Sequence, residues 1–210
     1  MQAYTSRCGR GPSFEALKAC GWRFLIEPAQ PHKTLSPLPY CLDNGAWGCF
    51  VRGIPFDAGA FRRCLDSFGS GADWIVLPDI VGDGKASLPF SLSWLDDVSR
   101  FGRPMLLAAQ DGMTTDSIRP LVRRHGLGVF LGGSTEFKLG TMRDWGTLCR
   151  SEGVHFHVAR VNSEKRIRLC QDAGANSFDG SSPARFRNKI RRLDHARRQG
   201  HLFAGMEAGA

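Results

Sequence analysis

Short apolar runs alternate along this chain with segments in which apolar residues recur at helical spacing. The runs are β-prone and have the length of strands, and turn residues separate each run from the next segment. Eight such runs, the first and last being the weakest, lie at 2–6, 22–27, 38–43, 73–79, 104–110, 128–133, 155–160 and 176–180.

Helical spacing is clearest in three of the intervening segments, 56–69, 88–102 and 163–174. The third has helix signals at both ends. Ser163 precedes it as a candidate N-cap, and Gly174 follows as a residue suited to the left-handed turn that ends many helices.

Strands that alternate with helices predict a parallel sheet with helical crossovers. Eight such units in 210 residues predict an α/β fold of the compact (β/α)8 TIM barrel type. A doubly wound open sheet is the main alternative. Its usual nucleotide signatures, G-x-G-x-x-G after the first strand or a Walker A sequence, do not occur, and we expect residues 80–87 to form a loop. We expect one domain over 1–200 and a flexible tail over 201–210.

Composition narrows the setting of the protein. No apolar run reaches the roughly 18–20 residues that span a bilayer, and the N-terminus has no apolar signal region. The seven cysteines are scattered, and several lie in apolar runs. That usage favours reduced, buried thiols over a disulfide framework. We therefore expect a cytoplasmic protein that is not attached to a membrane.

The formal net charge is +8, and much of the excess lies in the segment 185–199. These residues are either one solvated face of a C-terminal helix or a patch that faces the phosphates of a nucleic acid. On the second interpretation the phosphate-contacting candidates are Arg185, Arg187 and Arg191, together with Arg160 at a strand end.

Polar residues and glycines gather where the predicted strands end. They are Asp43, Asp79, Gln110, Gly132, Gly133, Arg160 and Asp179. In a barrel all of these positions converge on one rim, where active sites are built. Each residue singly has a structural explanation, because Asp and Gly are common in turns and Asp caps helices. Grouped carboxylates are costly to bury, and this favours a function for the set.

Other chemistries are weaker candidates. His155 and His157 share one face of a strand and could form a metal pair, although satisfied barrel histidines are the stronger interpretation. We predict no metal site. Trp47 and Phe137 lie beside the rim and could stack on a planar ligand or belong to the core.

Five segments together resemble a known family. They are YCLDNGAW, WIVLPDIVGDG, LLAAQDGM, VFLGGSTEFKLG and HVARVNSEKRIRLCQDAGANSFDG. In order and context they resemble the tRNA-guanine transglycosylase superfamily, and most closely its phage- and island-encoded branch that inserts 7-deazaguanines into DNA. The resemblance runs from about 38 to 180. The chain departs from the family in lacking its C-terminal zinc site, in placing Glu136 one position early, and in having Val158 where the family has a methionine.

The resemblance implies a role for each strand-end residue. Asp179 would be the nucleophile and Asp43 a general acid or base, although the pattern alone does not decide which of the two attacks. Asp79 would recognise the base. Gln110 and the backbone amides of Gly132 and Gly133 would bind it as well.

The implied activity is base exchange in DNA, guanine for a free 7-deazaguanine such as preQ0, through a covalent aspartyl-glycosyl intermediate and without a cofactor. DNA would be the partner, with tRNA less favoured, and an accessory protein is compatible with this scheme. Three alternatives remain: a reduced tRNA transglycosylase, a non-catalytic nucleic-acid-binding barrel, and a barrel hydrolase or lyase that acts on a small anionic metabolite.

Overall fold

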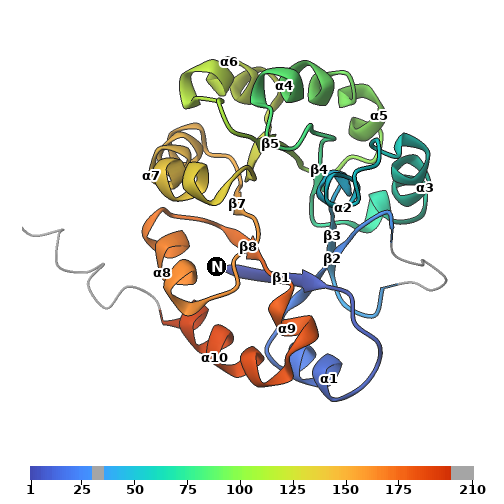
Figure 1. Cartoon of the computed structure of the whole chain (residues 1–210), viewed down its shortest axis with the longest axis vertical. Coiled ribbons are helices and arrows are strands. Elements are labelled where there is room, and N and C mark those ends of the chain that lie inside the picture. The colour runs from blue at the N-terminus through green and yellow to red at the C-terminus, as the bar shows by residue number, and fades with distance from the viewer. Residues whose placement is uncertain (30–35, 200–210) are drawn as a thin grey trace, which may run out of the picture.

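Eight parallel strands close into a barrel in the computed structural model, which describes residues 1–29 and 36–199 (Figure 1). Each strand pairs with the next in the sequence, and β8 pairs with β1 to close the ring. The strands are β1 (Gln2–Ser6), β2 (Arg23–Ile26), β3 (Tyr40–Leu42), β4 (Ile75–Val76), β5 (Met105–Ala109), β6 (Gly128–Leu131), β7 (Phe156–Val158) and β8 (Ser177–Asp179). The predicted (β/α)8 barrel is confirmed, and the eight apolar runs contain its eight strands. The expected tail at 201–210 lies outside the described residues.

Helices form a ring outside the strands (Figure 1). They are α1 (Pro12–Ala19), α2 (Ala46–Val51), α3 (Ala58–Phe68), α4 (Gly84–Leu92), α5 (Leu95–Ser99), α6 (Thr115–His125), α7 (Thr135–Glu152), α8 (Glu164–Asp172), α9 (Ser182–Arg185) and α10 (Arg187–Arg198), with a 3₁₀ turn, η1 (Gly69–Gly71), after α3. The connection from β2 to β3 carries no helix in the residues that the structure describes.

Local signals explain where several helices begin and end. The Ser163 side chain accepts a hydrogen bond from the Arg166 N–H and caps α8, and Gly174 follows that helix with φ +79°, as predicted. The predicted loop at 80–87 is wrong in its second half. Asp83 accepts from the Ala86 N–H at 3.0 Å and starts α4 at Gly84. The predicted helix at 88–102 is two helices, α4 and α5, separated at Ser93 and Trp94.

Two apolar clusters hold the barrel together. The larger lies between the strands and the helices, and the smaller fills the barrel interior. The interior cluster consists of Tyr4, Leu25, Cys41, Trp74, Val76, Leu106, Ala108, Phe130 and Ala159. A filled interior is typical of this fold and makes the ring a rigid frame for the residues at its rim.

The ring is thinnest between β3 and β4. Their register contains one residue pair, Leu42 with Ile75, whereas β5 and β6 share four. Pro78, just beyond β4, has no N–H with which to extend the ladder.

All seven cysteines are free thiols, and five of them are buried. Among the described residues, no helix combines the length and the apolar character required to cross a membrane.

Candidate active site

The C-terminal ends of the strands surround a cavity of about 330 Å³. Eight of the sequence-predicted residues line it: Asp43, Asp79, Gln110, Gly132, Gly133, Arg160, Asp179 and Arg185. Arg187 and Arg191 do not line it, because they lie on the exposed surface of α10. Their contact with nucleic acid stays a prediction, as does DNA as a partner.

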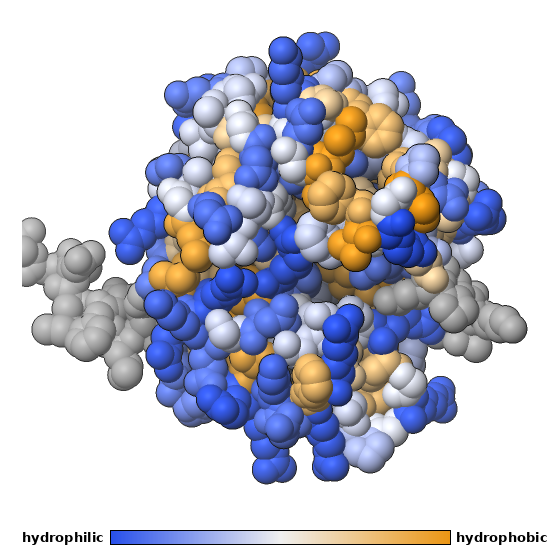
Figure 2. Space-filling view, in the orientation of Figure 1, coloured by the Kyte–Doolittle hydropathy of each residue, from blue (hydrophilic) through white to orange (hydrophobic). Residues whose placement is uncertain are grey.

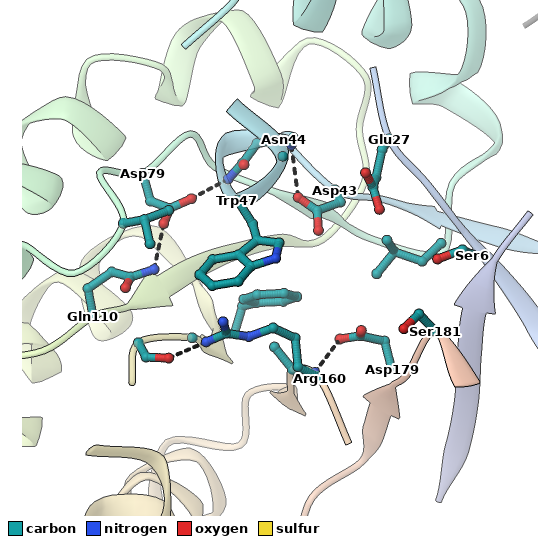
Figure 3. A pocket seen from close by; sticks show the side chains of 18 of the residues that line it. Ser6, Glu27, Asp43, Asn44, Trp47, Asp79, Gln110, Arg160, Asp179 and Ser181 are labelled. Carbon is teal, nitrogen blue, oxygen red and sulfur yellow. Dashed lines mark hydrogen bonds between the residues drawn. The ribbon is translucent and has the colours of Figure 1, made fainter. Parts of the chain in front are cut away.

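Asp79 lies at one end of the cavity in a closed hydrogen-bond arrangement (Figure 3). Its Oδ1 accepts from Asn44 Nδ2 and its Oδ2 accepts from Gln110 Nε2, both at 2.6 Å. Asn44 also donates to the Leu77 carbonyl at 2.8 Å, and Gln110 Oε1 accepts from the Gly82 N–H at 3.0 Å. Burial raises the pKa of Asp79 to about 6, although the two amide donors act in the opposite direction. This end of the cavity is held rigidly.

Gly132 and Gly133 are required by this packing. A Cβ at Gly132 would come within 2.8 Å of Gln110 Nε2, and one at Gly133, where φ is +72°, within 2.6 Å of Asp111 Oδ2. Asp111 in turn accepts from the Ser134 N–H at 2.7 Å and from its hydroxyl at 2.5 Å, at the start of α7. The glycine pair therefore lets the rim approach Gln110 and Asp111 closely.

Arg160 forms part of the cavity wall. Its guanidinium lies over the Trp47 ring, 4.1 Å from the centroid, and donates to the Gly133 carbonyl. Among the described residues it is the one non-glycine residue with a positive φ, 60°. Such backbone strain costs of the order of 1–3 kcal/mol and tends to persist at functional sites.

Three acidic side chains, Glu27, Asp43 and Asp179, gather at the other end of the cavity (Figure 3). Burial and the nearby Asp179 charge raise the pKa of Glu27. Burial, with Glu27 beside it, raises the pKa of Asp43 well above its ordinary range, against the hydrogen bond that Asp43 Oδ1 accepts from the Gly45 N–H at 2.9 Å. Neighbouring acids that disfavour each other's charge retain a proton between them.

Asp179 differs from these two acids because it has a histidine behind it. Its Oδ1 lies 3.0 Å from His157 Nε2 and accepts from the Arg160 N–H at 3.3 Å. His157 is fully buried inside the barrel. Asp179 therefore faces the cavity with a fixed orientation.

The histidine pair is not arranged as a metal site. His155 Nε2 and His157 Nδ1 both contact the same Ser177 hydroxyl, at 2.7 and 2.8 Å. No group of three His, Cys, Asp or Glu side chains suited to a metal ion occurs within 1–29 and 36–199.

Sequence reasoning missed Glu27 and Asn44. Glu27 ends the apolar run 22–27, so the signal that identified the other strand ends was also present there. Asn44 follows Asp43 in a sequence typical of a turn. Trp47 lines the cavity, as one of its two interpretations required, whereas Phe137 packs against Trp145 with the core.

The surface beside the cavity is apolar. Figure 2 shows hydrophobic side chains over α2, next to a hollow near the centre of that face. Trp47, Phe50, Val51 and Ile54 are each at least 45% exposed.

Comparison with known proteins identifies the fold and no family. The sequence matches no protein-family model and no curated protein. A solved 3-hexulose-6-phosphate synthase aligns over 93% of this chain and 99% of its own, with 15% identity and a TM-score of 0.55. A tryptophan synthase alpha-subunit from Pyrococcus furiosus aligns over 93% and 94%, with 13% identity and a TM-score of 0.56. A mandelate oxidase aligns over 92% and 70%, with 11% identity and a TM-score of 0.53.

These neighbours overturn the resemblance to the tRNA-guanine transglycosylase superfamily. They are other barrel families, and no family model supports the motif matches. The base exchange on DNA or tRNA that the resemblance implied is therefore wrong. The physical reason is that Asp and Gly at strand ends serve the turns of barrels in general, so short segments of this kind are shared without common function.

Proposed function

We propose that this protein is an enzyme that transfers protons to and from a small, uncharged or cationic polar substrate, in an isomerisation or an elimination. The observation that carries the proposal is the group of Glu27, Asp43 and Asp179 at one end of the cavity, where two acids have raised pKa values and the third does not share their hydrogen-bond surroundings. Carboxyl groups with different surroundings in one cavity can serve one as the acid and another as the base.

The acid in this scheme is Asp43, with Glu27 as its proton-sharing neighbour. A raised pKa lets Asp43 keep its proton at a pH where an ordinary aspartate has lost it. Donation of that proton to a hydroxyl or carbonyl oxygen of the substrate would assist its departure or its enolisation.

The base is Asp179, which would take a proton from carbon or oxygen of the bound molecule. Its Oδ1 is committed to His157 and to the Arg160 N–H. Its second oxygen is therefore the one that would meet the substrate.

The charge of the cavity favours an uncharged or cationic substrate. Its lining carries the acids Glu27, Asp43, Asp79 and Asp179 against Arg160 and Arg185. Arg160 lies among these carboxylates, so its charge is largely offset by theirs. Trp47 and Phe130 offer apolar surface to the carbon skeleton.

The name of one structural neighbour, 3-hexulose-6-phosphate synthase, points to a sugar phosphate. It supports a polyhydroxylated substrate here, and the charge of this cavity argues against the phosphate. A small anionic metabolite is thus the second candidate, and a direct test separates the two.

The test is deuterium wash-in. The protein is incubated in D₂O with a panel of free aldoses, ketoses and amino sugars, and separately with their phosphate esters, and loss of C–H signals is followed by proton NMR. We expect wash-in with at least one free sugar or amino sugar, and its loss in Asp179→Asn.

Wash-in restricted to the phosphate esters would replace the proposed substrate class with the anionic one. An unchanged wash-in rate in Asp179→Asn would remove Asp179 as the base. Isothermal titration with the same ligand distinguishes lost binding from lost proton transfer.

A further inference from the structure

A line of polar side chains leads from the cavity into the barrel interior. Asp179 Oδ1 lies 3.0 Å from His157 Nε2, His157 Nδ1 lies 2.8 Å from Ser177 Oγ, and Ser177 Oγ lies 2.7 Å from His155 Nε2. His157 and Ser177 have no exposed surface. The four side chains form one continuous hydrogen-bonded chain.

The register of two neighbouring strands builds this chain. β7 and β8 are parallel, and His157 pairs directly with Ser177. Side chains alternate along a strand, so residues two apart share a face. His155, just before β7, and His157 in β7 therefore meet Ser177 and Asp179 of β8, all directed into the barrel.

Aromatic side chains enclose the chain. The Phe130 ring stacks on the His157 imidazole with a centroid distance of 4.9 Å and an interplanar angle of 10°. The Trp74 ring centroid lies 4.7 Å from that of His157. Tyr4 approaches His157 edge-on. The charged group that acts on His155 from the neighbouring elements is Asp73, itself paired with Arg23.

The far end of the chain reaches the opposite side of the barrel. His155 is partly exposed and, with Gly153, Gly174 and Asn176, lines a second hollow of about 400 Å³. These residues precede β7 and β8, so the hollow lies at the N-terminal ends of the strands. The chain thus runs from one mouth of the barrel to the other.

Elementary hydrogen-bond chemistry determines the direction of every link. An ionised Asp179 only accepts, so His157 must carry its proton on Nε2 and accept at Nδ1. The Ser177 hydroxyl has one proton, which it donates to His157 Nδ1. Ser177 Oγ then accepts from His155 Nε2–H, and all donors point toward Asp179.

We propose that His155, Ser177 and His157 form a proton relay that exchanges protons between Asp179 and the hollow at the N-terminal end of the barrel. A proton taken up at His155 Nδ1 is balanced by one passed from Nε2 to Ser177 Oγ. The Ser177 proton moves to His157 Nδ1, and the His157 Nε2 proton moves to Asp179. The reverse sequence returns a proton from Asp179 to the hollow, and no electrons or other groups move.

This inference rests on the proposed function in one respect, that Asp179 gains and loses protons during turnover. A bound substrate would cover the cavity side of Asp179, and the relay supplies a route from the other side. Burial lowers the pKa of His157 and lowers that of His155 to about 4. Both rings therefore stay neutral near pH 7 and can each accept on one nitrogen while donating on the other.

The first test needs no substitution and no substrate. In protein labelled with ¹⁵N-histidine, long-range proton–nitrogen correlation spectra at pH 7 report the tautomer of each ring. We expect the Nε2–H tautomer for both His155 and His157. An Nδ1–H tautomer in one ring with an Nε2–H tautomer in the other would break the chain of donors and overturn the relay.

The second test measures proton movement. In Asp179→Asn protein the amide cannot pass a proton, so the His157 ring N–H exchanges with water only through Ser177 and His155. Adding Ser177→Ala should slow that exchange by up to about tenfold, the effect of losing one hydrogen-bonded link, and Ser177→Thr should restore it. Backbone amide exchange of β7 and β8 serves as the control for general opening of the barrel.

An unchanged His157 exchange rate in Asp179→Asn/Ser177→Ala protein would refute the relay. Neither measurement uses turnover, so the proposed function can fail while the relay stands. Conversely, the relay would be refuted and the proposed function would stand if two results came together. The histidine tautomers would differ from those expected, and deuterium wash-in would persist in Ser177→Ala protein.

Discussion

Asp79 and Asp43 follow neighbouring strands and line the same cavity, yet their surroundings differ. Asp79 accepts two short amide hydrogen bonds, from Asn44 and Gln110, and those amides are themselves held by backbone groups. Asp43 accepts one backbone N–H and otherwise faces Glu27 and Asp179. A carboxylate with both oxygens satisfied is a fixed acceptor, whereas one crowded by other acids is suited to holding and releasing a proton.

The contrast teaches that burial alone does not assign a role. Burial is the largest cause of the raised pKa at both residues. At Asp79 the neighbours oppose the effect of burial, and at Asp43 the acidic neighbours add to it. The neighbours therefore distinguish a binding carboxylate from a proton donor.

The largest expected effect is on catalysis by the acidic end. Asp43→Asn should reduce deuterium wash-in by about 10²- to 10⁴-fold, the range for removal of a general acid or base. Glu27→Gln should shift the alkaline limb of the pH–rate profile to lower pH, because the pKa of the acid Asp43 falls when its like-charged neighbour is neutral. Initial wash-in rates from pH 4 to 9 give both results. A profile unchanged by Glu27→Gln would contradict proton sharing.

The next effect is the pH dependence of stability. The pKa of Asp79 rises from 3.8 to about 6 on folding, so the folded state binds more protons than the unfolded state in this window. The contribution of Asp79 to the free energy of unfolding should therefore fall by about 3 kcal/mol as the pH rises from about 4 to about 6. Urea denaturation across this range measures the slope, and Asp79→Asn should flatten it. A slope identical in the two proteins would show that Asp79 titrates normally.

A third prediction compares the unfolding free energies of Asp79→Asn and Asp43→Asn at pH 7. Asp79→Asn would set a new amide against the amide of Asn44 or Gln110, and turning Gln110 would leave the Gly82 N–H unpaired. We expect a loss of about 1–3 kcal/mol in unfolding free energy. Asp43→Asn keeps an acceptor for the Gly45 N–H and relieves the crowding of acids, so this variant should be no less stable than the wild type. The reverse order of stabilities would contradict the difference between the two carboxylates.

Arg160→Lys should have a smaller effect. It removes the flat contact with Trp47 and the guanidinium bond to Gly133, together about 1 kcal/mol. Arg62→Lys is the matched control, because the Arg62 guanidinium lies 4.5 Å over Trp94, and Trp94 does not line the cavity. Both changes should lower stability slightly, and Arg160→Lys alone should weaken ligand affinity in titration. Equal effects on affinity would remove Arg160 from the binding wall.

The smallest effect is expected on α10. Arg187→Ala with Arg191→Ala should leave wash-in unchanged and the unfolding free energy within about 0.5 kcal/mol, as is usual for exposed positions. Binding to duplex DNA at several salt concentrations tests the predicted partner. If both residues contact phosphates, the salt slope should fall by about 1 for each. A drop in wash-in would extend the functional surface to this helix.

Strand positions were predictable because a parallel barrel buries nearly continuous apolar runs, and turn residues separate them. The gathering of Asp43, Asp79 and Asp179 at one rim follows from that topology alone. Glu27 was missed although it carries the same signal. The hydrogen bond from Asn44, the neighbour of Asp43, to Asp79 was not predictable, because it depends on side-chain geometry across two turns.

The relay shows a different limit. The sequence contains the pattern of two alternating pairs, His155 with His157 and Ser177 with Asp179. Alternation places each pair on one face of its strand, but the register between the strands decides whether the pairs meet. That register is set by closure of the whole barrel. The mistaken family assignment has a related cause. Residues at strand ends are selected by the turns that they form, so short similar segments there are weak evidence of common ancestry.

The narrow join between β3 and β4, where the ring has a single pair of facing residues, has a consequence for ligand binding. Asn44 lies just after β3, and its side chain donates across this join to the Leu77 carbonyl and to Asp79. A molecule bound to Asp79 would contact this same Asn44–Asp79 link from the cavity side. Asn44 and Asp79 would then support both the β3–β4 contact and the bound molecule, so ligand binding should make this part of the barrel more rigid.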